Sequence, residues 1–576
     1  MKKLLQIILV LCTSVTLFAC NRTEENKEDP EVQAQFDSYL DELFKDEIEA
    51  DFLTFHYMLA DPEAGGYEKP EVDWGSLTLE STKQSIEDSK DDLDKLHEFE
   101  KEKLTDDQQK IYRLLEIQLE YNVEYENYYM EYGFCFGENK VNDNLITNLT
   151  EYRISNEEDV EDFIVLLEDV DRYIGEGIEA TQQMADEGYI QKESEKEAIL
   201  EQCRNFLESE EIEKYFHDEV MQLEELSEAQ KSDYEAQVAE AVANDVKPAY
   251  ENIITLYEQL PAAENQGSLA ERETGKAYFE YLLKTQVGKE RSVDEWIKIV
   301  EEEIEDTIYN WINIMFRTDI DAELENVELP ADNAVDLVHY LEGCLDEEFP
   351  AIEQVEYRVD YLDASVANNL VSAYYVIPPI DAPDQNVIKV NPSNTDLVDL
   401  FSTLAHEGFP GHLYQNNYAV QNGQPKIYYL LDNLGSSEGW AEYVGMDAYR
   451  IGHIGSEDFQ EYMRLYSYLN RMLNEYIGLQ VNYNGWQSDD IADYLDSIGL
   501  VSDIAQDLYE DAVLRPAMYA PYSLGTYEVY ALREKAEDAL GDNFDVLSFN
   551  QALLDAGTVH FEIIEQEIDE YIENSK

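Results

Sequence analysis

Apolar residues recur at intervals of three and four over most of this chain, which is the spacing of one face of an α-helix. The stretches "FDSYLDELFKDEIEADFLTFHYML" (36–59) and "TDDQQKIYRLLEIQLEYNVEYENYYMEY" (105–132) follow this spacing, and Pro and Gly are sparse from 33 to 265. Further helices are expected over 395–420, 431–450, 457–483 and 525–575. The pattern therefore predicts a mainly α fold with a large helical body.

One stretch departs from the helical pattern. In "NNLVSAYYVIPPIDAPDQNVIKVNPSN" (368–394), two runs of β-branched and aromatic residues are separated by Pro- and Asp-rich turn chemistry. This predicts a small β-hairpin or pair of strands, with strands confined mainly to this stretch. The run "NVIKVNP" (386–392) could offer backbone groups to an extended peptide, although a plain structural hairpin is the alternative.

The N-terminus has the character of an export signal. In "MKKLLQIILVLCTSVTLFAC", two lysines precede an apolar run that is short for a membrane span, and Ala19 precedes Cys20. The ending "LFAC" resembles a bacterial lipobox, so we expect a lipid on Cys20; an ordinary signal peptide is the alternative. The sequence therefore predicts a lipoprotein on the extracytoplasmic side of a bacterial cell membrane. The protein is expected to contact the membrane only through this lipid anchor.

After the signal of residues 1–20, the polar stretch 21–32 is expected to form a flexible tether. Residues 33–265 form a predicted N-terminal helical region and residues 266–576 a catalytic helical region, and we expect the two to make one continuous domain. Only Cys135, Cys203 and Cys344 follow Cys20, so one disulfide at most can form.

The net charge of −89 is extreme. It argues against nucleic acid and against an anionic membrane surface as partners. A solubilising acidic surface explains the charge, and electrostatic steering of cationic peptides into a cleft is the alternative.

The stretch "TLAHEGFPGHLYQ" (403–415) contains two histidines six residues apart. In a regular helix such residues lie about 240° apart and cannot share a metal, whereas residues four apart can. Pro410 removes an amide donor, and Gly411 can adopt backbone angles that are closed to other residues. The helix must bulge or break there, which could return His412 to the side of His406.

A third ligand is expected nearby, because catalytic zinc takes three protein ligands and leaves one position open. The stretch "SSEGWAEYVG" (436–445) offers Glu438 and Glu442, which lie four apart on one helix face. Either glutamate could be the ligand.

Together, "HEGFPGHLYQ" and "EGWAEY" resemble the bacterial family called domain of unknown function 885, whose pattern is His-Glu-x-x-Pro-Gly-His-x-x-Gln followed by Glu-Gly-Trp-Ala. The resemblance extends to "ETGKAYFEYLLKTQVGKERSVDEW" (273–296) and "YSLGTYEVYALR" (522–533). The family is regarded as related to the gluzincin metallopeptidases, with a mostly helical fold and many exported members. The resemblance implies His406, His412 and Glu438 as ligands of one Zn²⁺ and Glu407 as the catalytic base.

One segment departs from the family. Where the family tends to have Pro-Gly-Gln-Ala, this chain has "RPAMYAPYSLG" (515–525), so that Ala517 and Met518 replace the Gly and the Gln. Pro516, Tyr522 and Gly525 still match. The resemblance therefore does not extend to substrate binding by this loop.

The predicted function is a surface-tethered zinc metallopeptidase that hydrolyses peptides, with Glu407 as general base. Tyr522 is the first candidate for the donor to the oxyanion, and Tyr519 and Tyr527 are the next candidates, expected near the metal or the substrate. Arg533 could bind a substrate carboxylate, or form a surface ion pair; Glu442 is assigned to the surroundings of the metal. The alternatives are a non-catalytic lipoprotein that binds peptide or metal, and a helical scaffold with fortuitous histidines.

Overall fold

The computed structural model describes residues 29–131, 135–137, 140–262, 267–345, 348–362 and 371–576, and it is 70% helical. The predicted mainly α class is confirmed. Cys20, most of the predicted tether and residues 368–370 lie outside the described residues. Within the described ranges, no helix combines the length and apolar character that a membrane span requires.

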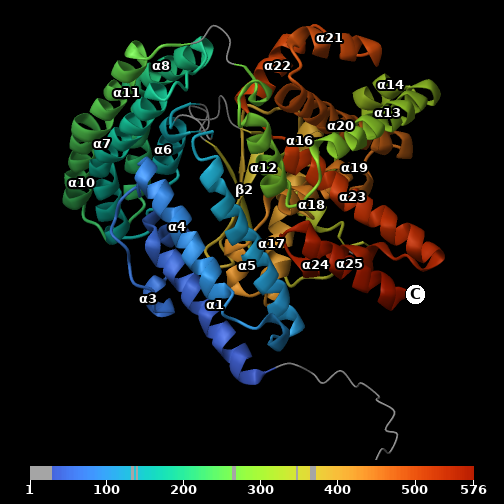
Figure 1. Ribbon diagram of the computed structural model, residues 1–576, viewed down its shortest axis with the longest axis horizontal. Helices are drawn as coiled ribbons and strands as arrows, with labels where there is room; N and C mark the ends of the chain where they lie inside the picture. Colours follow the sequence, from blue (N-terminus) through green and yellow to red (C-terminus); the bar gives the residue numbers. More distant parts are fainter. Residues whose placement is uncertain (1–28, 132–134, 138–139, 263–266, 346–347, 363–370) are drawn as a thin grey trace, which may run out of the picture.

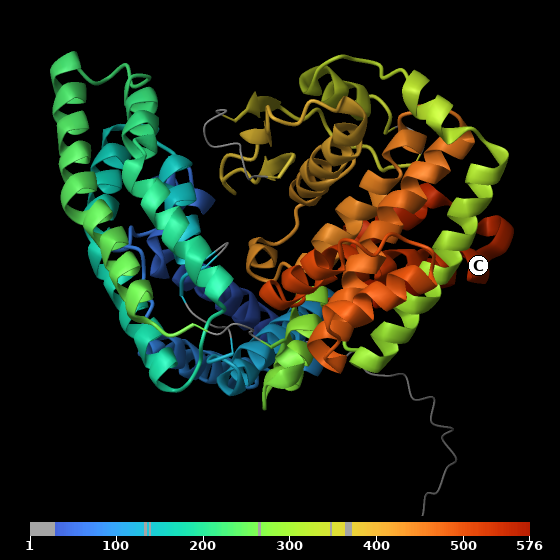
Figure 2. The ribbon, with the colours of Figure 1, turned by 90° about the horizontal axis from the view of Figure 1, so that it is seen from above.

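The N-terminal helices include a bundle, formed by α7, α8, α10 and α11, that makes up one side of the molecule in Figure 2. Capping boxes at Thr105 and Ser227 begin α5 and α10. Phe163, Phe216 and Tyr250 are buried in the core of the bundle. The helices are α1 (Pro30–Ala50), α2 (Phe52–Met58), α3 (Pro62–Gly65), α4 (Leu79–Leu96), α5 (Asp106–Glu124), α6 (Val141–Thr150), α7 (Glu157–Asp186), α8 (Glu193–Glu208), α9 (Glu211–Val220), α10 (Glu228–Ala241) and α11 (Lys247–Gln259).

The remaining helices form the other side of the molecule, and a small sheet lies at the edge of this side that faces the bundle (Figures 1 and 2). The predicted helical stretch 525–575 is three helices, because the chain turns after α23 at Gly541 and after α24 at Gly557, both with positive φ. The helices are α12 (Gly275–Val287), α13 (Val293–Arg317), α14 (Ile320–Asn326), α15 (Ala334–Glu342), α16 (Leu397–Glu407), α17 (His412–Gln421), α18 (Leu434–Met446), α19 (Ala448–Ile451), α20 (Glu457–Leu479), α21 (Ser488–Ser497), α22 (Ala505–Leu514), α23 (Ala520–Leu540), α24 (Val546–Ala556) and α25 (Phe561–Ser575).

The sheet has three strands in the order β1-β3-β2, namely β1 (Tyr357–Tyr361), β2 (Ala373–Val376) and β3 (Asn386–Val390). β2 and β3 form the predicted antiparallel pair, with Ala373 opposite Val390. β1 pairs with β3 in parallel and was not predicted. β1 is only five residues long and carries Arg358 and Asp360. Its alternation of apolar and polar residues is too weak to identify it as a strand from the sequence.

The order of the strands corrects one prediction. β3 is the central strand, so its backbone groups are hydrogen-bonded to β1 on one side and to β2 on the other. The prediction that 386–392 offers free backbone groups to a peptide is therefore wrong. β1 and β2 are the two edge strands, and β2 packs against α16.

The largest apolar core is shared between the two halves of the sequence. It contains Phe36 of α1 and Leu115 of α5 together with Ile388 of β3, Leu404 of α16 and Phe561 of α25. Burying each such side chain contributes roughly 1.5–3 kcal/mol. The helices that carry the candidate site are thus held partly by N-terminal helices, whereas the domain boundary at residue 265 stays a sequence prediction.

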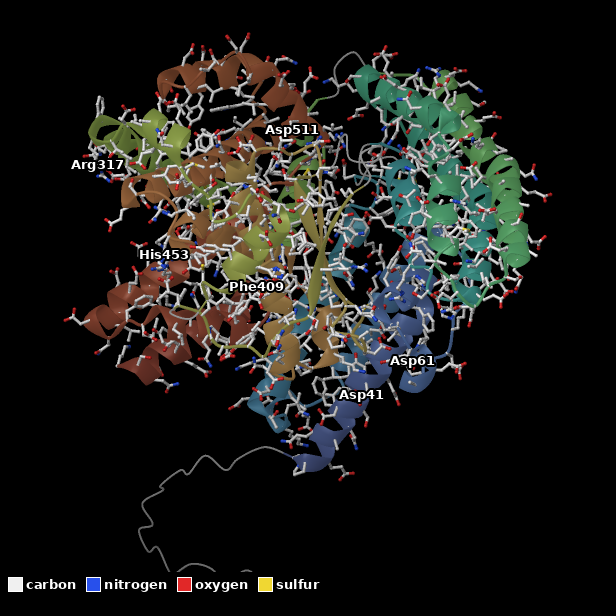
Figure 3. All side chains as sticks on the ribbon, turned by 180° about the vertical axis from the view of Figure 1, so that it is seen from behind. Asp41, Asp61, Arg317, Phe409, His453 and Asp511 are labelled. Carbon is white, nitrogen blue, oxygen red and sulfur yellow. The ribbon has the colours of Figure 1, made fainter. Side chains whose placement is uncertain are left out.

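The surface carries the charge predicted from the composition. Oxygen-tipped side chains surround the outline of the molecule in Figure 3, in agreement with 128 acidic against 39 basic residues.

Candidate metal centre

The two histidines of the motif lie at facing ends of two helices. Asp396 caps the start of α16 by accepting a hydrogen bond from the Val398 N–H (2.9 Å). α16 ends at Glu407, directly after His406, and α17 begins at His412, so the interruption predicted from Pro410 and Gly411 is present. The turn is compact, because the Gly411 N–H donates to the carbonyl of Ala405 (2.9 Å).

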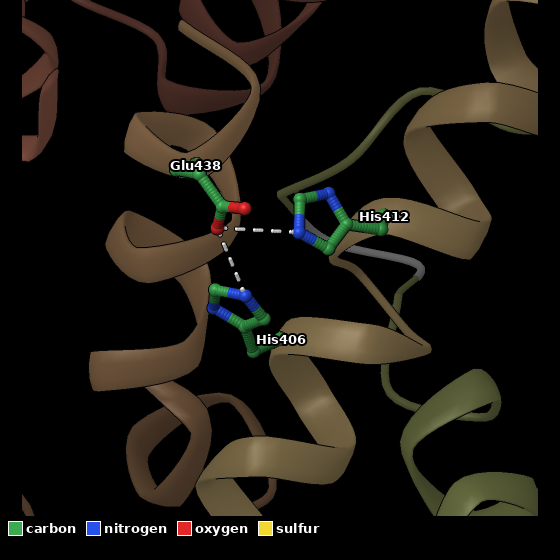
Figure 4. A group of neighbouring side chains, drawn as sticks. All are labelled: His406, His412 and Glu438. Atoms are coloured by element: carbon green, nitrogen blue, oxygen red, sulfur yellow. Dashed lines mark ion pairs between the residues drawn. The ribbon is translucent and has the colours of Figure 1, made fainter. Parts of the chain in front are cut away.

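His406, His412 and Glu438 converge on one point (Figure 4). Glu438 Oε2 lies 3.2 Å from His406 Nε2 and 3.4 Å from His412 Nε2. The two imidazole planes are almost perpendicular, at 89°, with their centroids 4.8 Å apart. One ligand atom from each of the three residues lies within 4.8 Å of the others. The structure thus brings together the three predicted ligands.

The geometry of these atoms fits a zinc ion. Glu438 Oε2 is buried and forms no hydrogen bond in the described part of the chain, although two imidazole nitrogens face it. Its distances to them exceed the 2.7–2.9 Å or so of a charge-assisted hydrogen bond. They match the edge of about 3.4 Å of a tetrahedron whose centre lies roughly 2.0–2.1 Å from each ligand. Two imidazoles and one carboxylate are also a donor set that zinc prefers.

Glu442 supports the site from the other side of His406. Its Oε1 lies 3.7 Å from His406 Nδ1 and accepts a hydrogen bond from Arg471 Nη2 (2.6 Å). A carboxylate in this position orients a ligating imidazole and fixes its tautomer. Of the two glutamates left open by the sequence, Glu438 therefore faces the metal position and Glu442 holds His406.

The charges within the site shift the pKa values of its groups. Burial opposes protonation of His406, but the neighbouring carboxylates, that of Glu438 foremost, raise its pKa to about 9. Burial raises the pKa of Glu438, but the two imidazoles outweigh it and hold this pKa well below the usual range. Without a metal, the two shifts favour an imidazolium at His406 beside a carboxylate at Glu438, and a metal ion would displace the proton from the ring.

Glu407 lies beside the three ligands without joining them. Its Oε2 accepts a hydrogen bond from the Tyr375 N–H of β2 (2.8 Å), and its Oε1 lies 3.8 Å from His406 Nε2. Burial raises the pKa of Glu407, although the two histidines oppose this. A fixed carboxylate with a raised pKa, next to the metal position, has the properties of a general base.

Tyr522 reaches the site because α18 and α23 cross at glycines. A Cβ atom on Gly525 would lie 2.1 Å from the carbonyl oxygen of Gly435, so any larger residue would separate the helices. The Glu438 carboxylate lies near the Tyr522 hydroxyl, and burial followed by the charge of this carboxylate raises the pKa of Tyr522. The hydroxyl therefore stays protonated and can act as a donor.

These residues line a cavity of about 960 Å³. Its walls come from the β2 edge, α16, α17, α18, α20 and α23. The lining includes Tyr374, Tyr375, His406, Glu407, His412, Asn416, Tyr429, Asp432, Glu438, Glu442, Asn470, Arg471, Asn474 and Tyr522.

Three of the predicted site residues lie outside the lining of this cavity. Burial, followed by the neighbouring Asp511 carboxylate, raises the pKa of Tyr519. The Tyr527 ring packs against Trp296, with centroids 6.1 Å apart. Arg533 donates to the hydroxyl of Tyr443 and to Glu537, each at 2.8 Å. The structure does not bring these three side chains to the metal position.

Comparison with known proteins identifies the family. The sequence pattern of DUF885, described as a bacterial protein of unknown function, matches residues 62–568. The chain belongs to the DUF885 family. None of the curated proteins matches it.

Two solved structures share the fold of this DUF885 protein. One, from Colwellia psychrerythraea, superposes with a TM-score of 0.81 at 18% identity, over 94% of this chain and 100% of the other. The second, from Shewanella oneidensis, gives a TM-score of 0.61 at 16% identity, over 92% and 98%. Both are described as putative lipoproteins, the second of unknown function.

Sequence reasoning missed several residues of the DUF885 site. Arg471 and Tyr375 reach it from α20 and β2, and neither stands in a motif. Asp432 lines the cavity, and burial raises its pKa. Its position two residues before α18 was the one local signal that could have drawn attention to it.

Proposed function

We propose that this DUF885 protein is a zinc-dependent peptidase related to the gluzincins, and that a lipid on Cys20 holds it on the extracytoplasmic side of a bacterial membrane. One observation carries the enzymatic part of the proposal. Two imidazoles and a carboxylate meet at one point on the wall of a large cavity, with the Glu407 carboxylate 3.8 Å from His406 Nε2. A protein that only binds peptide or metal has no use for this fourth, buried group.

His406, His412 and Glu438 would hold the ion. A zinc ion in such a site lowers the pKa of water toward neutrality and polarises a peptide carbonyl. Glu407 takes a proton from the attacking water at Oε1, while the Tyr375 N–H holds Oε2 in place. The water oxygen bonds to the carbonyl carbon, the C–N bond breaks, and Glu407 gives the proton to the leaving amine.

Tyr522 and β2 have the two remaining roles, which are stabilisation of the oxyanion and binding of the substrate backbone. The Tyr522 hydroxyl donates a hydrogen bond to the oxyanion that develops on the carbonyl oxygen. Because the backbone groups of alternate residues in a strand face opposite sides, those of Ala373 and Tyr375 point away from β3. The Tyr375 N–H is bound to Glu407, which leaves the Tyr375 carbonyl and the backbone groups of Ala373 for a peptide. An extended peptide can pair with this edge of β2 and lie across the site.

The proposed location rests on the N-terminal sequence and on relatives. Both similar structures are described as putative lipoproteins. The nine residues between Cys20 and Pro30, where α1 begins, span at most about 30 Å when extended. The protein would therefore work close to the membrane surface.

The test uses the chain without residues 1–20. We expect one zinc per chain by metal analysis, and metal-dependent cleavage of a peptide library that contains free and blocked termini, followed by mass spectrometry. Chelation should abolish cleavage and added zinc should restore it. Bound zinc without cleavage would support the non-catalytic binder instead, and absence of zinc binding would overturn the metal centre.

A further inference from the structure

Arg471 is the one Lys or Arg side chain among the described residues that line the cavity. It faces a lining that includes the carboxyl groups of Asp432, Glu407, Glu438 and Glu442. We propose that Arg471 binds the α-carboxylate of the peptide, so that the protein removes residues from the C-terminus. This inference rests on the proposed peptidase function and names its substrate class.

The guanidinium of Arg471 is held in place but not enclosed. Nη2 donates to Glu442 Oε1 at 2.6 Å, and the guanidinium carbon lies 5.4 Å from the centroid of the Tyr522 ring. The side chain is still 37% exposed. A guanidinium presents five N–H donors, so the bond to Glu442 leaves the group able to bind a second carboxylate.

Polar neighbours on α20 surround this charge. Ser467, Asn470 and Asn474 also line the cavity, and they lie within four residues of Arg471 along the helix. Asn470 Nδ2 and Asn474 Nδ2 each donate to the backbone carbonyl four residues earlier. The Ser467 hydroxyl and the second N–H of each amide can complete the hydrogen bonding of a carboxylate. This wall of the cavity is therefore suited to an anion, whereas the carboxylates around the metal position repel one.

Arg533, the residue that the sequence suggested for a substrate carboxylate, is a weaker candidate. It lies outside the cavity lining, and both its Nε and its Nη1 donate to other side chains. Arg471, in contrast, lies close to the site, because Glu442 contacts both Arg471 and His406. Arg471 and the three candidate ligands therefore line the same cavity, with Glu442 between Arg471 and His406.

The reaction is then the release of the C-terminal amino acid. Water adds to the last peptide carbonyl, the C–N bond breaks, and the proton from Glu407 goes to the amine of the released residue. Arg471 lies between Glu442 and the substrate carboxylate, which offsets the repulsion between them. An internal peptide bond, or a blocked C-terminus, lacks the group that Arg471 binds.

The first test compares two peptides that differ only in a free or an amidated C-terminus, with the zinc-loaded protein. We expect amidation to lower kcat/KM by about 10- to 100-fold, the range for a lost charge-assisted hydrogen bond. Arg471→Gln should lose a similar factor on the free acid, mainly through KM, and little on the amide. Arg464→Gln is the matched control, since Arg464 lies on the same helix and pairs with Glu461 outside the cavity.

Arg471 also contacts Glu442 and Tyr522, so a purely structural role must be distinguished. Such a role would lower kcat equally for both peptides, and that result would overturn the proposal. So would a wild-type protein that cleaves the amide as fast as the acid.

Binding gives a readout that does not depend on turnover. In zinc-loaded Glu407→Gln, calorimetry should give tighter binding of the free acid than of the amide, and adding Arg471→Gln should abolish the difference. If no peptide is cleaved although zinc is bound, the proposed function fails, while this binding difference still decides the role of Arg471. Equal affinity for the free acid and the amide would overturn the proposal that Arg471 binds the α-carboxylate.

Discussion

Gly411 packs directly against the backbone of His406. A Cβ atom on Gly411 would lie 1.7 Å from the carbonyl oxygen of His406 and 2.4 Å from its carbonyl carbon. No side-chain rotation can relieve such a clash, because the obstructing atoms belong to the backbone. This close approach lets α17 start near the end of α16 and lets His412 face Glu438.

We therefore expect Gly411→Ala to damage the metal centre. The turn must open, which should destabilise the protein by about 1–3 kcal/mol and lower zinc affinity by on the order of 10- to 100-fold. Thermal unfolding and zinc titration against a chelator measure the two effects. Gly175→Ala is the control: a Cβ there meets nothing within 4 Å, so this change in α7 should stabilise the protein by about 0.5–1 kcal/mol. Unchanged zinc affinity in Gly411→Ala would contradict the role given to this glycine.

Much of the fold could be predicted from local sequence. Helical periodicity and sparse Pro and Gly identify the helices, and turn chemistry between two apolar runs identifies β2 and β3. β1 could not be recognised, because its one neighbour in the sheet is β3, which begins 29 residues after Tyr357 at Asn386. A strand that is defined by a non-local partner leaves little trace in its own residues.

The candidate site also contains a part that local sequence predicts and a part that depends on contacts between distant segments. His406, Glu407 and His412 lie within seven residues, and the conformational limits on Pro410 and Gly411 resolve their odd spacing. The need for a third ligand leaves Glu438 and Glu442 as alternatives, and the family resemblance implies Glu438. Arg471 could not be predicted from the sequence. Its contact with Glu442 depends on how α20 packs against α18, and no local sequence pattern indicates this packing.

Glu407→Gln should abolish peptide hydrolysis and leave zinc bound. Gln keeps the size of Glu and can still accept the Tyr375 N–H, but it cannot take a proton from water. Losing a general base commonly costs about 10²–10⁴-fold in rate. Steady-state kinetics with metal analysis of the same sample measures both quantities.

His412→Ala serves as the comparison, since removal of a ligand should release zinc together with activity. Full turnover by Glu407→Gln at full zinc occupancy would exclude this base. Loss of zinc from Glu407→Gln would instead make Glu407 a ligand.

Tyr522→Phe should lower kcat by about 10²–10³-fold, as removal of an oxyanion donor does in other hydrolases, with little change in zinc content. Tyr527→Phe is the matched control on the same helix, because the Tyr527 ring packs against Trp296 away from the cavity. Equal effects of the two substitutions on kcat would argue against a direct role of the Tyr522 hydroxyl.

Glu475 makes the stability of the protein depend on pH. This glutamate of α20 is buried, and Ser523 Oγ donates a hydrogen bond to its Oε2 (3.0 Å). Burial raises the pKa of Glu475 to about 7, although the bond from Ser523 opposes the shift. Since the pKa in the folded protein is above that in the unfolded chain, the folded state binds the proton more tightly. The contribution to stability is therefore complete below about pH 4.5 and is lost as the pH rises through 7.

Glu475→Gln should remove this dependence, because the amide is neutral at every pH and still accepts the Ser523 hydrogen bond. Metal-free Glu475→Gln should exceed the wild type in stability at pH 8, by up to about 3 kcal/mol for a shift of this size, and match it near pH 4.5. The measurement is the midpoint of thermal unfolding between pH 4.5 and 8 with chelator present. Glu201→Gln, an exposed change on α8, should follow the wild type throughout. A pH profile of Glu475→Gln identical to that of the wild type would show that Glu475 is ionised in the folded protein at neutral pH.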